Sequence, residues 1–282
     1  DVYKRQVLLP WVLIQLVLLV IGWFQRTYAR NLGQLIGTVL LSLAYSPKAW
    51  LANAMAQAEQ ALSDLSQEPP YGHWAQEPID SCCFGHSLGG LLGLSLPSLA
   101  NGEAQQRLQP KVIVAADPAT NTEMGIPGFA IWLLKCFRAP FTADPISIRE
   151  TGRQLRCPVA ILHGLADTLV PPQLWAVAGG GGDFSAIASE AKALYFANSN
   201  TQKSADLVAF HNQAVTSTQY YDDALFAHFG GVKDGVNAYN TTWIWPALIA
   251  LCRDRIDPRD LLAHLPDDRP FAVSTDPPAS RA

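Results

Sequence analysis

A serine within a glycine-rich turn is the residue that most clearly indicates chemistry in this sequence. Ser87 lies in the segment GHSLGG at residues 85–90, which contains the pattern Gly-x-Ser-x-Gly. The flanking residues predict a buried strand over 79–84 and a helix over 89–96. Such a strand–turn–helix unit exposes the serine Oγ at the helix start, and we expect a side chain at either glycine of the pattern to collide with backbone. Ser87 is therefore the predicted nucleophile, and a plain turn with a serine cap is the alternative.

A nucleophilic serine needs a general base, and the base needs an acid that orients it. Asp167 follows a predicted strand over residues 158–163, within the segment HGLADTLVPP. Loops at the carboxyl ends of parallel strands collect catalytic groups in open α/β sheets, so Asp167 is the expected acid. Asp117 is the alternative, because it also directly follows a predicted strand, over residues 112–116.

The base is expected after the last strand, and two histidines satisfy that order. We favour His211, in DLVAFHNQA, and keep His228, in FAHFGG, as the alternative. His86 stands too close to Ser87 in the sequence to act as its base, and His163 fits a packed core position at the end of a strand. The sequence thus predicts a catalytic triad in the chain order serine, aspartate, histidine.

Short apolar runs alternate with helical patterns along the chain, which is typical of an α/β protein with a mostly parallel central sheet and helices on both faces. Residues 15–264 are expected to form one domain, between an apolar segment of uncertain role over 1–14 and a flexible tail over 265–282. Residues 119–156 show no clear strand and are rich in large apolar side chains, so they predict a cap or lid. The other expected elements are strands over 15–21, 37–44 and 194–197 and helices over 27–36, 47–65, 185–193 and 242–252.

The composition excludes several classes of protein. Charged residues make up 16% of the chain and hydrophobic residues 49%, so disorder is excluded over most of it. The 20 Lys and Arg residues against 24 Asp and Glu residues give a net charge of −4, which argues against a nucleic-acid partner. The five cysteines include no Cys-x-x-Cys pair, so they indicate neither a zinc site nor a disulfide framework.

An uncharged apolar stretch over residues 7–24, with basic residues on both sides, first suggests a membrane anchor. Pro10 and Gln15 interrupt this stretch, and residues 15–21 fit a central strand of a parallel sheet, which is also continuously apolar. The remaining residues 7–14 are too few to cross a bilayer, because a spanning helix needs about 20 residues. Membrane association is therefore the less favoured interpretation.

The segments GHSLGG and HGLADTLVPP, together with a later histidine, resemble the α/β-hydrolase superfamily over residues 15–255. Within it, Asp117-Pro118 after a strand and LVAFH around His211 are similar to the chlorophyllase-like branch and to polyester hydrolases of the cutinase or dienelactone-hydrolase type. The resemblance implies an α/β-hydrolase fold and cleavage of carboxylic esters through an acyl-enzyme. The chlorophyllase-like pattern would make Asp117 the acid, which keeps that alternative open.

An oxyanion hole needs two backbone N–H donors. Leu88 supplies one by its position next after the nucleophile. By resemblance the second donor is Trp23, or else Phe24, in a segment where Ile21 stands in place of the family's usual histidine. Trp23, Phe24 and His86 are also expected to contact the substrate.

The sequence therefore predicts a serine hydrolase of carboxylic esters that acts on a small-molecule or lipid-like substrate. The alternative is a catalytically impaired α/β-hydrolase-fold protein that binds an apolar ligand or a partner, with or without a membrane tether. The sequence contains no phosphate-binding glycine loop, nucleotide fingerprint or metal-ligand pattern, so we expect no cofactor and no metal. The residues leave the particular ester, the oligomeric state and the cellular location open.

Overall fold

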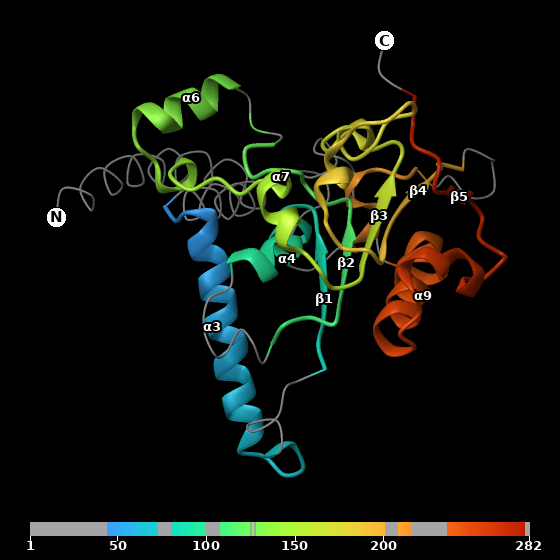
Figure 1. Ribbon diagram of the computed structural model, residues 1–282, viewed down its shortest axis with the longest axis horizontal. Helices are drawn as coiled ribbons and strands as arrows, with labels where there is room; N and C mark the ends of the chain where they lie inside the picture. Colours follow the sequence, from blue (N-terminus) through green and yellow to red (C-terminus); the bar gives the residue numbers. More distant parts are fainter. Residues whose placement is uncertain are drawn as a thin grey trace, which may run out of the picture.

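The computed structural model of the chain describes residues 44–72, 80–99, 108–124, 126, 128–200, 208–215 and 236–279. These residues form a central sheet with helical segments against it (Figure 1). The elements expected over 15–21 and 27–36 and most of the strand expected over 37–44 lie outside the described residues, as do the predicted site residues Trp23, Phe24 and His228.

Among the described residues, four parallel strands and one short antiparallel strand form the sheet, in the order β1-β2-β3-β4-β5. The parallel strands are β1 (Cys82–His86), β2 (Val112–Ala116), β3 (Val159–Gly164) and β4 (Lys192–Ala197). Neighbouring strands end side by side, because His86 pairs with Ala116 and Gly164 pairs with Ala197. The carboxyl ends of β1 to β4 therefore meet along one edge of the sheet, where the connecting segments begin.

Alternate strand residues pack on opposite faces of the sheet. On one face, residues such as Ile161 belong to the same apolar cluster as Leu94 of α4 (Leu88–Leu99). On the other face, residues such as Leu162 cluster with Trp243 of the C-terminal helical run. Every residue of β2 and β3 is buried, as expected for a parallel sheet covered on both sides. The predicted fold class, a mostly parallel α/β sheet with helices on both faces, is confirmed.

The C-terminal helical run spans residues 238–253 and has π-helical turns on both sides of a short α-helix. Its parts are η8 (Asn240–Ile244), α9 (Trp245–Leu248) and η9 (Ile249–Arg253). Pro246 lies inside the run and has no N–H for an α-helical hydrogen bond, which fits the change of helix type around it. The helix expected over 242–252 is confirmed within this run.

The helix expected over 47–65 is confirmed as α3 (Pro47–Ser66). It begins after Ser46, whose side chain accepts a hydrogen bond from the Ala49 N–H at 3.2 Å and so caps the helix. The described part of the connection from β2 to β3 contains the helical segments α6 (Gly128–Cys136), η2 (Pro140–Thr142), α7 (Ile148–Thr151) and η3 (Gly152–Gln154). Further 3₁₀ turns are η4 (Pro172–Leu174), η5 (Asp183–Ala186), η6 (His211–Ala214) and η10 (Pro258–His264).

One predicted helix boundary and one predicted helix are wrong. The sequence predicts that the helix after Ser87 stops before Pro97, but α4 continues to Leu99. Pro97 falls in its last turn, where a proline removes one backbone hydrogen bond without interrupting a long helix. The helix expected over 185–193 is instead the 3₁₀ turn η5 followed by the start of β4, because Lys192 pairs with Val159 of β3.

The tail expected to be flexible over 265–282 contributes to the fold. Its segment β5 (Val273–Ser274) pairs antiparallel with Phe196 and Ala197 at the end of β4. Phe271, just before β5, is buried in the apolar cluster on the face of the C-terminal helical run. The polar composition of this segment did not indicate these contacts, because only a few of its residues take part in them.

Among the described helices, none is both long enough and apolar enough to cross a bilayer. The uncharged stretch over residues 7–24 lies outside the described residues.

Candidate functional site

Ser87 occupies a left-handed turn between β1 and α4. Its φ angle is +55°, a conformation that non-glycine residues adopt at an energetic cost and that a nucleophile elbow requires. The end of β2 holds this turn on both sides. The Ser87 N–H donates to the Ala116 carbonyl at 3.0 Å, and the Ala119 N–H donates to the Ser87 carbonyl at 3.1 Å. The strained turn is thus fixed by hydrogen bonds to the neighbouring strand.

The glycines around Ser87 differ in what they contribute. A Cβ at Gly85 would lie 2.6 Å from the Gly89 carbonyl carbon, so Gly85 permits the turn. A Cβ at Gly89 would meet no atom within 4 Å, so the prediction that a side chain there collides with backbone is wrong. Gly90 is the second restricted position, because its Cβ would lie 2.8 Å from Pro118 Cβ. Of the three glycines in GHSLGG, the first and the last are therefore the positions where a larger side chain would clash.

The predicted base and acid lie in one hydrogen-bonded chain with Ser87. His211, at the start of η6, places Nε2 2.6 Å from Ser87 Oγ and Nδ1 2.7 Å from Asp167 Oδ2. Both Asp167 and His211 are buried. The His86 ring lies beside the His211 ring, and its Nε2 donates to the His211 main-chain carbonyl at 2.6 Å. The structure thus brings Ser87, His211 and Asp167 together, and places His86 against the main chain of the histidine.

A close contact between two backbone segments brings His211 to this place. A Cβ at Gly164, the last residue of β3, would overlap the Ala209 main-chain carbonyl. That carbonyl instead accepts a hydrogen bond from the Ala166 N–H at 3.1 Å. The segment before His211 therefore lies directly on the loop that leads to Asp167, and only glycine at position 164 allows the approach.

Asp167 is held by its own loop. Its Oδ1 accepts hydrogen bonds from the Leu169 N–H at 2.9 Å and the Val170 N–H at 2.8 Å. Its other oxygen, Oδ2, forms the hydrogen bond with His211 Nδ1. The carboxylate is therefore turned so that one oxygen fixes the loop and the other faces the imidazole.

Asp117 is buried under the same site but makes no hydrogen bond to His211 among the described contacts. It directly follows β2, has a φ angle of +44°, and its Oδ1 accepts a hydrogen bond from the Gly164 N–H at 2.7 Å. Burial, and secondarily the nearby charge of Asp167, raises the pKa of Asp117 well above its ordinary value. The geometry therefore assigns the contact with the histidine to Asp167.

Burial also keeps two of the histidines neutral. Burial, and secondarily the neighbouring His211, lowers the pKa of His86 to about 4. It lowers the pKa of His163 to about 4 as well. His163, expected as a packed core residue, is fully buried and donates from Nε2 to the Val170 carbonyl at 3.0 Å. Nothing in the residue pattern indicated this hydrogen bond between His163 and the acid loop, because its acceptor is a main-chain carbonyl.

Leu88 is the first residue of α4. The first four N–H groups of a helix have no acceptor within the helix, so the Leu88 N–H is available to an oxyanion beside Ser87. The second predicted donor, Trp23, and its alternative, Phe24, lie outside the described residues, as does His228.

Asp117, His163 and Asp167 also place oxygen and nitrogen atoms within 4.8 Å of one another, which is close enough for a metal site. These side chains already make hydrogen bonds to Gly164, Val170 and His211. A cation bound between them would disrupt contacts that hold the acid loop, so the donor set does not favour a metal.

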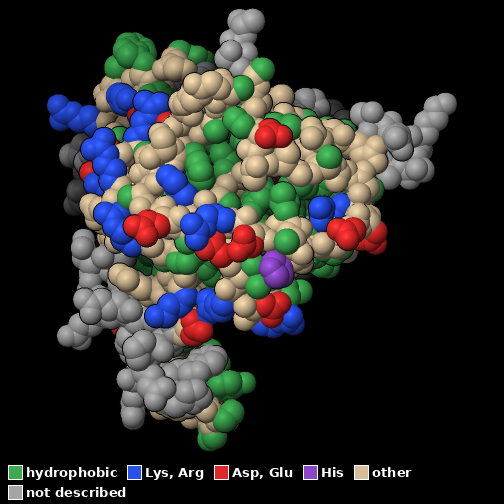
Figure 2. Space-filling view, turned by 45° about the vertical axis from the view of Figure 1, so that its right-hand side comes forward, with side chains coloured by type: hydrophobic (Ala, Val, Ile, Leu, Met, Phe, Trp, Pro, Cys, Tyr) green, Lys and Arg blue, Asp and Glu red, His purple; other side chains and the backbone are tan. Residues whose placement is uncertain are grey.

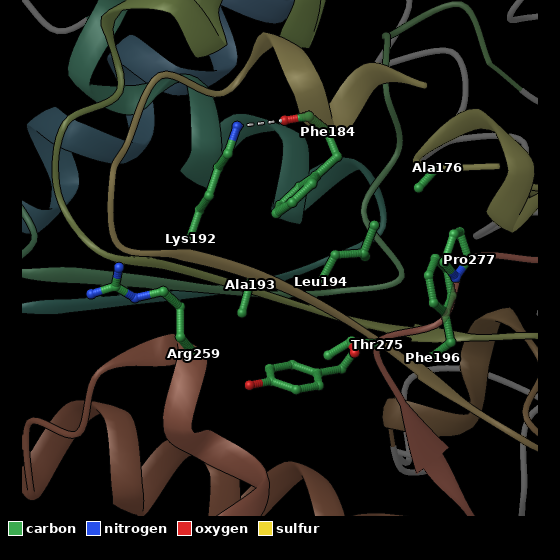
Figure 3. Close-up of a pocket in the computed structure, with 10 residues that line it drawn as sticks. Ala176, Phe184, Lys192, Ala193, Leu194, Phe196, Arg259, Thr275 and Pro277 are labelled. Carbon is green, nitrogen blue, oxygen red and sulfur yellow. Dashed lines mark hydrogen bonds between the residues drawn. The ribbon is translucent and has the colours of Figure 1, made fainter. Parts of the chain in front are cut away.

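A cavity of about 280 Å³ lies against β4, with Lys192 and Arg259 at one end of the view and apolar side chains at the other (Figure 3). Lys192 Nζ donates to main-chain carbonyl groups, and Arg259 forms an ion pair with Asp257. On the face shown in Figure 2, apolar side chains occupy a hollowed centre, and acidic and basic side chains are interspersed around it. The described residues that line the cavity exclude Ser87, so it is separate from the serine site.

The parallel sheet, the left-handed serine turn between β1 and α4, and an acid and a histidine that follow later strands in that order define an α/β-hydrolase fold. Among solved structures, the chain is similar to a monoacylglycerol lipase from Paleococcus ferrophilus, with 18% sequence identity and a TM-score of 0.35. The match covers 58% of this chain and 68% of the lipase chain. No protein-family model and no curated protein matches the sequence. A likeness at this level says nothing about the reaction, which depends on the geometry of the site.

The two glycines of the Gly-x-Ser-x-Gly pattern should respond differently to substitution. Gly85→Ala should lower the free energy of unfolding by about 1–3 kcal/mol, because its Cβ overlaps the backbone of α4. Gly89→Ala should leave stability unchanged or raise it by up to about 1 kcal/mol, since alanine favours a helix and the site is open. Urea unfolding of both variants measures the difference, and equal effects would contradict this account of the turn.

Proposed function

We propose that this protein is a serine hydrolase of carboxylic esters. The observation that carries the proposal is the chain of hydrogen bonds from Ser87 Oγ through His211 to Asp167. Ser87 is in the strained conformation of a nucleophile elbow, at the N-terminus of α4. A serine, a histidine and a buried carboxylate in this arrangement are the parts that acyl transfer requires.

In the proposed reaction, Ser87 Oγ attacks the ester carbonyl while His211 Nε2 accepts its proton. His211 then donates that proton to the departing alcohol, leaving an acyl group on Ser87. Water, activated by the same histidine, releases the acid and restores the serine. Asp167 Oδ2 keeps the Nδ1–H of His211 oriented and balances the positive charge of the imidazolium.

The tetrahedral intermediate needs donors for its oxyanion. We assign one to the Leu88 N–H at the start of α4, where the helix dipole adds to the stabilisation. We assign the second to Trp23, with Phe24 as the alternative, in line with the resemblance to α/β-hydrolases. His86 remains a predicted substrate contact, although its Nε2 is engaged with the His211 carbonyl.

The proposed substrate has an apolar acyl or alcohol part. This rests on α6, which projects from the rest of the described structure in Figure 1 and buries only Ile131. Phe129, Trp132 and Phe137 are 74%, 65% and 76% exposed, and they follow one another within or just after this helix. Several exposed aromatic side chains on one short segment favour contact with an apolar partner. An ester of a chlorophyllase-like or polyester type, or a lipid-like ester, has the required chemistry.

Removal of the nucleophile tests the proposal directly. Ser87→Ala should abolish turnover of a p-nitrophenyl ester and labelling by a fluorophosphonate probe, because no other described group lies within reach of His211 Nε2 as Ser87 Oγ does. The loss in kcat should be about 10⁶-fold, limited by background hydrolysis. Wild-type turnover in this variant, or an unlabelled wild-type protein, would favour the alternative of a binding protein.

A comparison of two isosteric variants tests the choice of acid. Asp167→Asn should lower kcat by about 10⁴-fold, because an amide at this place favours the wrong tautomer of His211. Asp117→Asn should lose much less activity, since Asp117 does not contact the histidine. Initial rates on the same ester measure both, and a larger loss in Asp117→Asn would identify Asp117 as the acid.

The role of α6 can be tested by substrate length. Trp132→Ser should raise KM for a long-chain ester by roughly tenfold, which corresponds to about 1.4 kcal/mol of lost apolar contact, and leave KM for an acetate ester unchanged. Trp245→Ser, on the C-terminal helical run, is the matched control because Trp245 is also partly exposed at 44%. An equal response of both variants would show that α6 has no special relation to the substrate.

A further inference from the structure

We infer that Asp117 is protonated on Oδ1, where it faces the Nδ1 atom of a neutral His163. This neutral pair of side chains positions the loop that carries the proposed catalytic acid. The role of this pair in catalysis rests on the proposed function, whereas the protonation of Asp117 can be measured without an activity assay. Asp117 is thereby a positioning residue, and Asp167 remains the acid.

The hydrogen-bond partners of His163 determine where its own proton lies. Its Nε2 is 3.0 Å from the Val170 carbonyl, which is an acceptor only, so Nε2 carries the N–H. The other nitrogen of a neutral imidazole is then a bare acceptor. That nitrogen, Nδ1, lies 3.4 Å from Asp117 Oδ1. Two bare acceptors that face each other repel, and a proton on Asp117 Oδ1 turns the contact into a weak hydrogen bond.

The surroundings of the pair favour this neutral state over an ion pair. Both side chains have no exposed area. The described donor to Asp117 is a main-chain N–H, that of Gly164, and not a charged side chain. Burial raises the pKa of Asp117 well above its ordinary value and lowers that of His163 to about 4, so the proton belongs on the carboxyl group.

The other titratable groups around the pair come from four elements. They are Asp167 in the acid loop, His211 in η6, His86 at the end of β1 and Tyr239 in the C-terminal helical run. Asp167 is the carboxylate among them, and its charge favours protonation of Asp117. Burial raises the pKa of Tyr239 well above its ordinary value, so the tyrosine stays neutral.

The neutral pair is connected to the acid through the loop backbone. His163 Nε2–H holds the Val170 carbonyl, and the N–H of the same residue donates to Asp167 Oδ1. Asp117 Oδ1 holds the Gly164 N–H at the other end of the loop. With Asp117 neutral, Asp167 alone supplies negative charge to His211, and the two carboxyl groups do not repel each other.

The proton can be observed by nuclear magnetic resonance of protein labelled with ¹³C at the aspartate carboxyl groups. At about pH 7 the wild type should show one carboxyl carbon with the chemical shift of a protonated acid. This signal should be lost in Asp117→Asn and kept in Asp183→Asn. Asp183 is the matched control, because it is also buried but accepts a hydrogen bond from the Arg149 guanidinium.

The same proton determines how stability depends on pH. Well above pH 6.5, the ordinary histidine pKa, the unfolded His163 and Asp117 have both lost their titrating protons, whereas the folded pair keeps one on Asp117. The folded state then binds more protons, so its stability falls as the pH rises. The unfolding equilibrium constant should rise by up to tenfold per pH unit until Asp117 ionises.

Urea unfolding between about pH 7 and about pH 9 measures this second effect. The stability of the wild type relative to Asp117→Asn should decline with rising pH, and its stability relative to Asp183→Asn should stay constant. If Asp117→Asn does not fold, the carboxyl ¹³C spectrum of the labelled wild-type protein is sufficient to test the inference. A wild-type spectrum without a protonated aspartate at about pH 7 overturns the inference, even if ester hydrolysis is observed.

Discussion

The site depends on one close approach of two backbone segments, Gly164 against Ala209. β3 ends at Gly164 and continues into the loop that carries Asp167, whereas Ala209 precedes His211 from a distant part of the chain. Because glycine has no Cβ, the Ala209 carbonyl can reach the Ala166 N–H and close the two segments on each other. The distances from His211 to the acid and to Ser87 follow from this contact.

The parallel sheet supplies the common edge on which this contact is built. β1 delivers Ser87, β2 delivers Asp117 and β3 delivers the loop of Asp167, all at their carboxyl ends. Apolar clusters cover the sheet to which these strands belong on both of its faces. The strain at Ser87 and Asp117, both with positive φ, is therefore held by a rigid and well-packed support.

Burial of several titratable groups at one edge has an electrostatic consequence. Two aspartates and three histidines lie within or beside the site, and they cannot all be charged where most of them are removed from water. The structure resolves this by keeping His86 and His163 neutral and by raising the pKa of Asp117. The charge that remains is placed on Asp167, which faces the histidine that must become positive during the proposed reaction.

The sequence by itself predicted the fold class and the turn at Ser87, and it favoured Asp167 and His211 over their alternatives, because strand periodicity, local turn chemistry and chain order are all written in short segments. It left Asp117 open as the acid, and it did not indicate Gly164, Gly90 or the contact of His163 with the acid loop. It also misplaced the end of α4. It predicted a helix over 185–193 and a flexible tail, where strand pairing with β3 and β4 overrides local preference. Only the tertiary structure decided these points, because they depend on backbone groups far apart in the chain, and main-chain carbonyls and N–H groups leave no trace in a residue pattern.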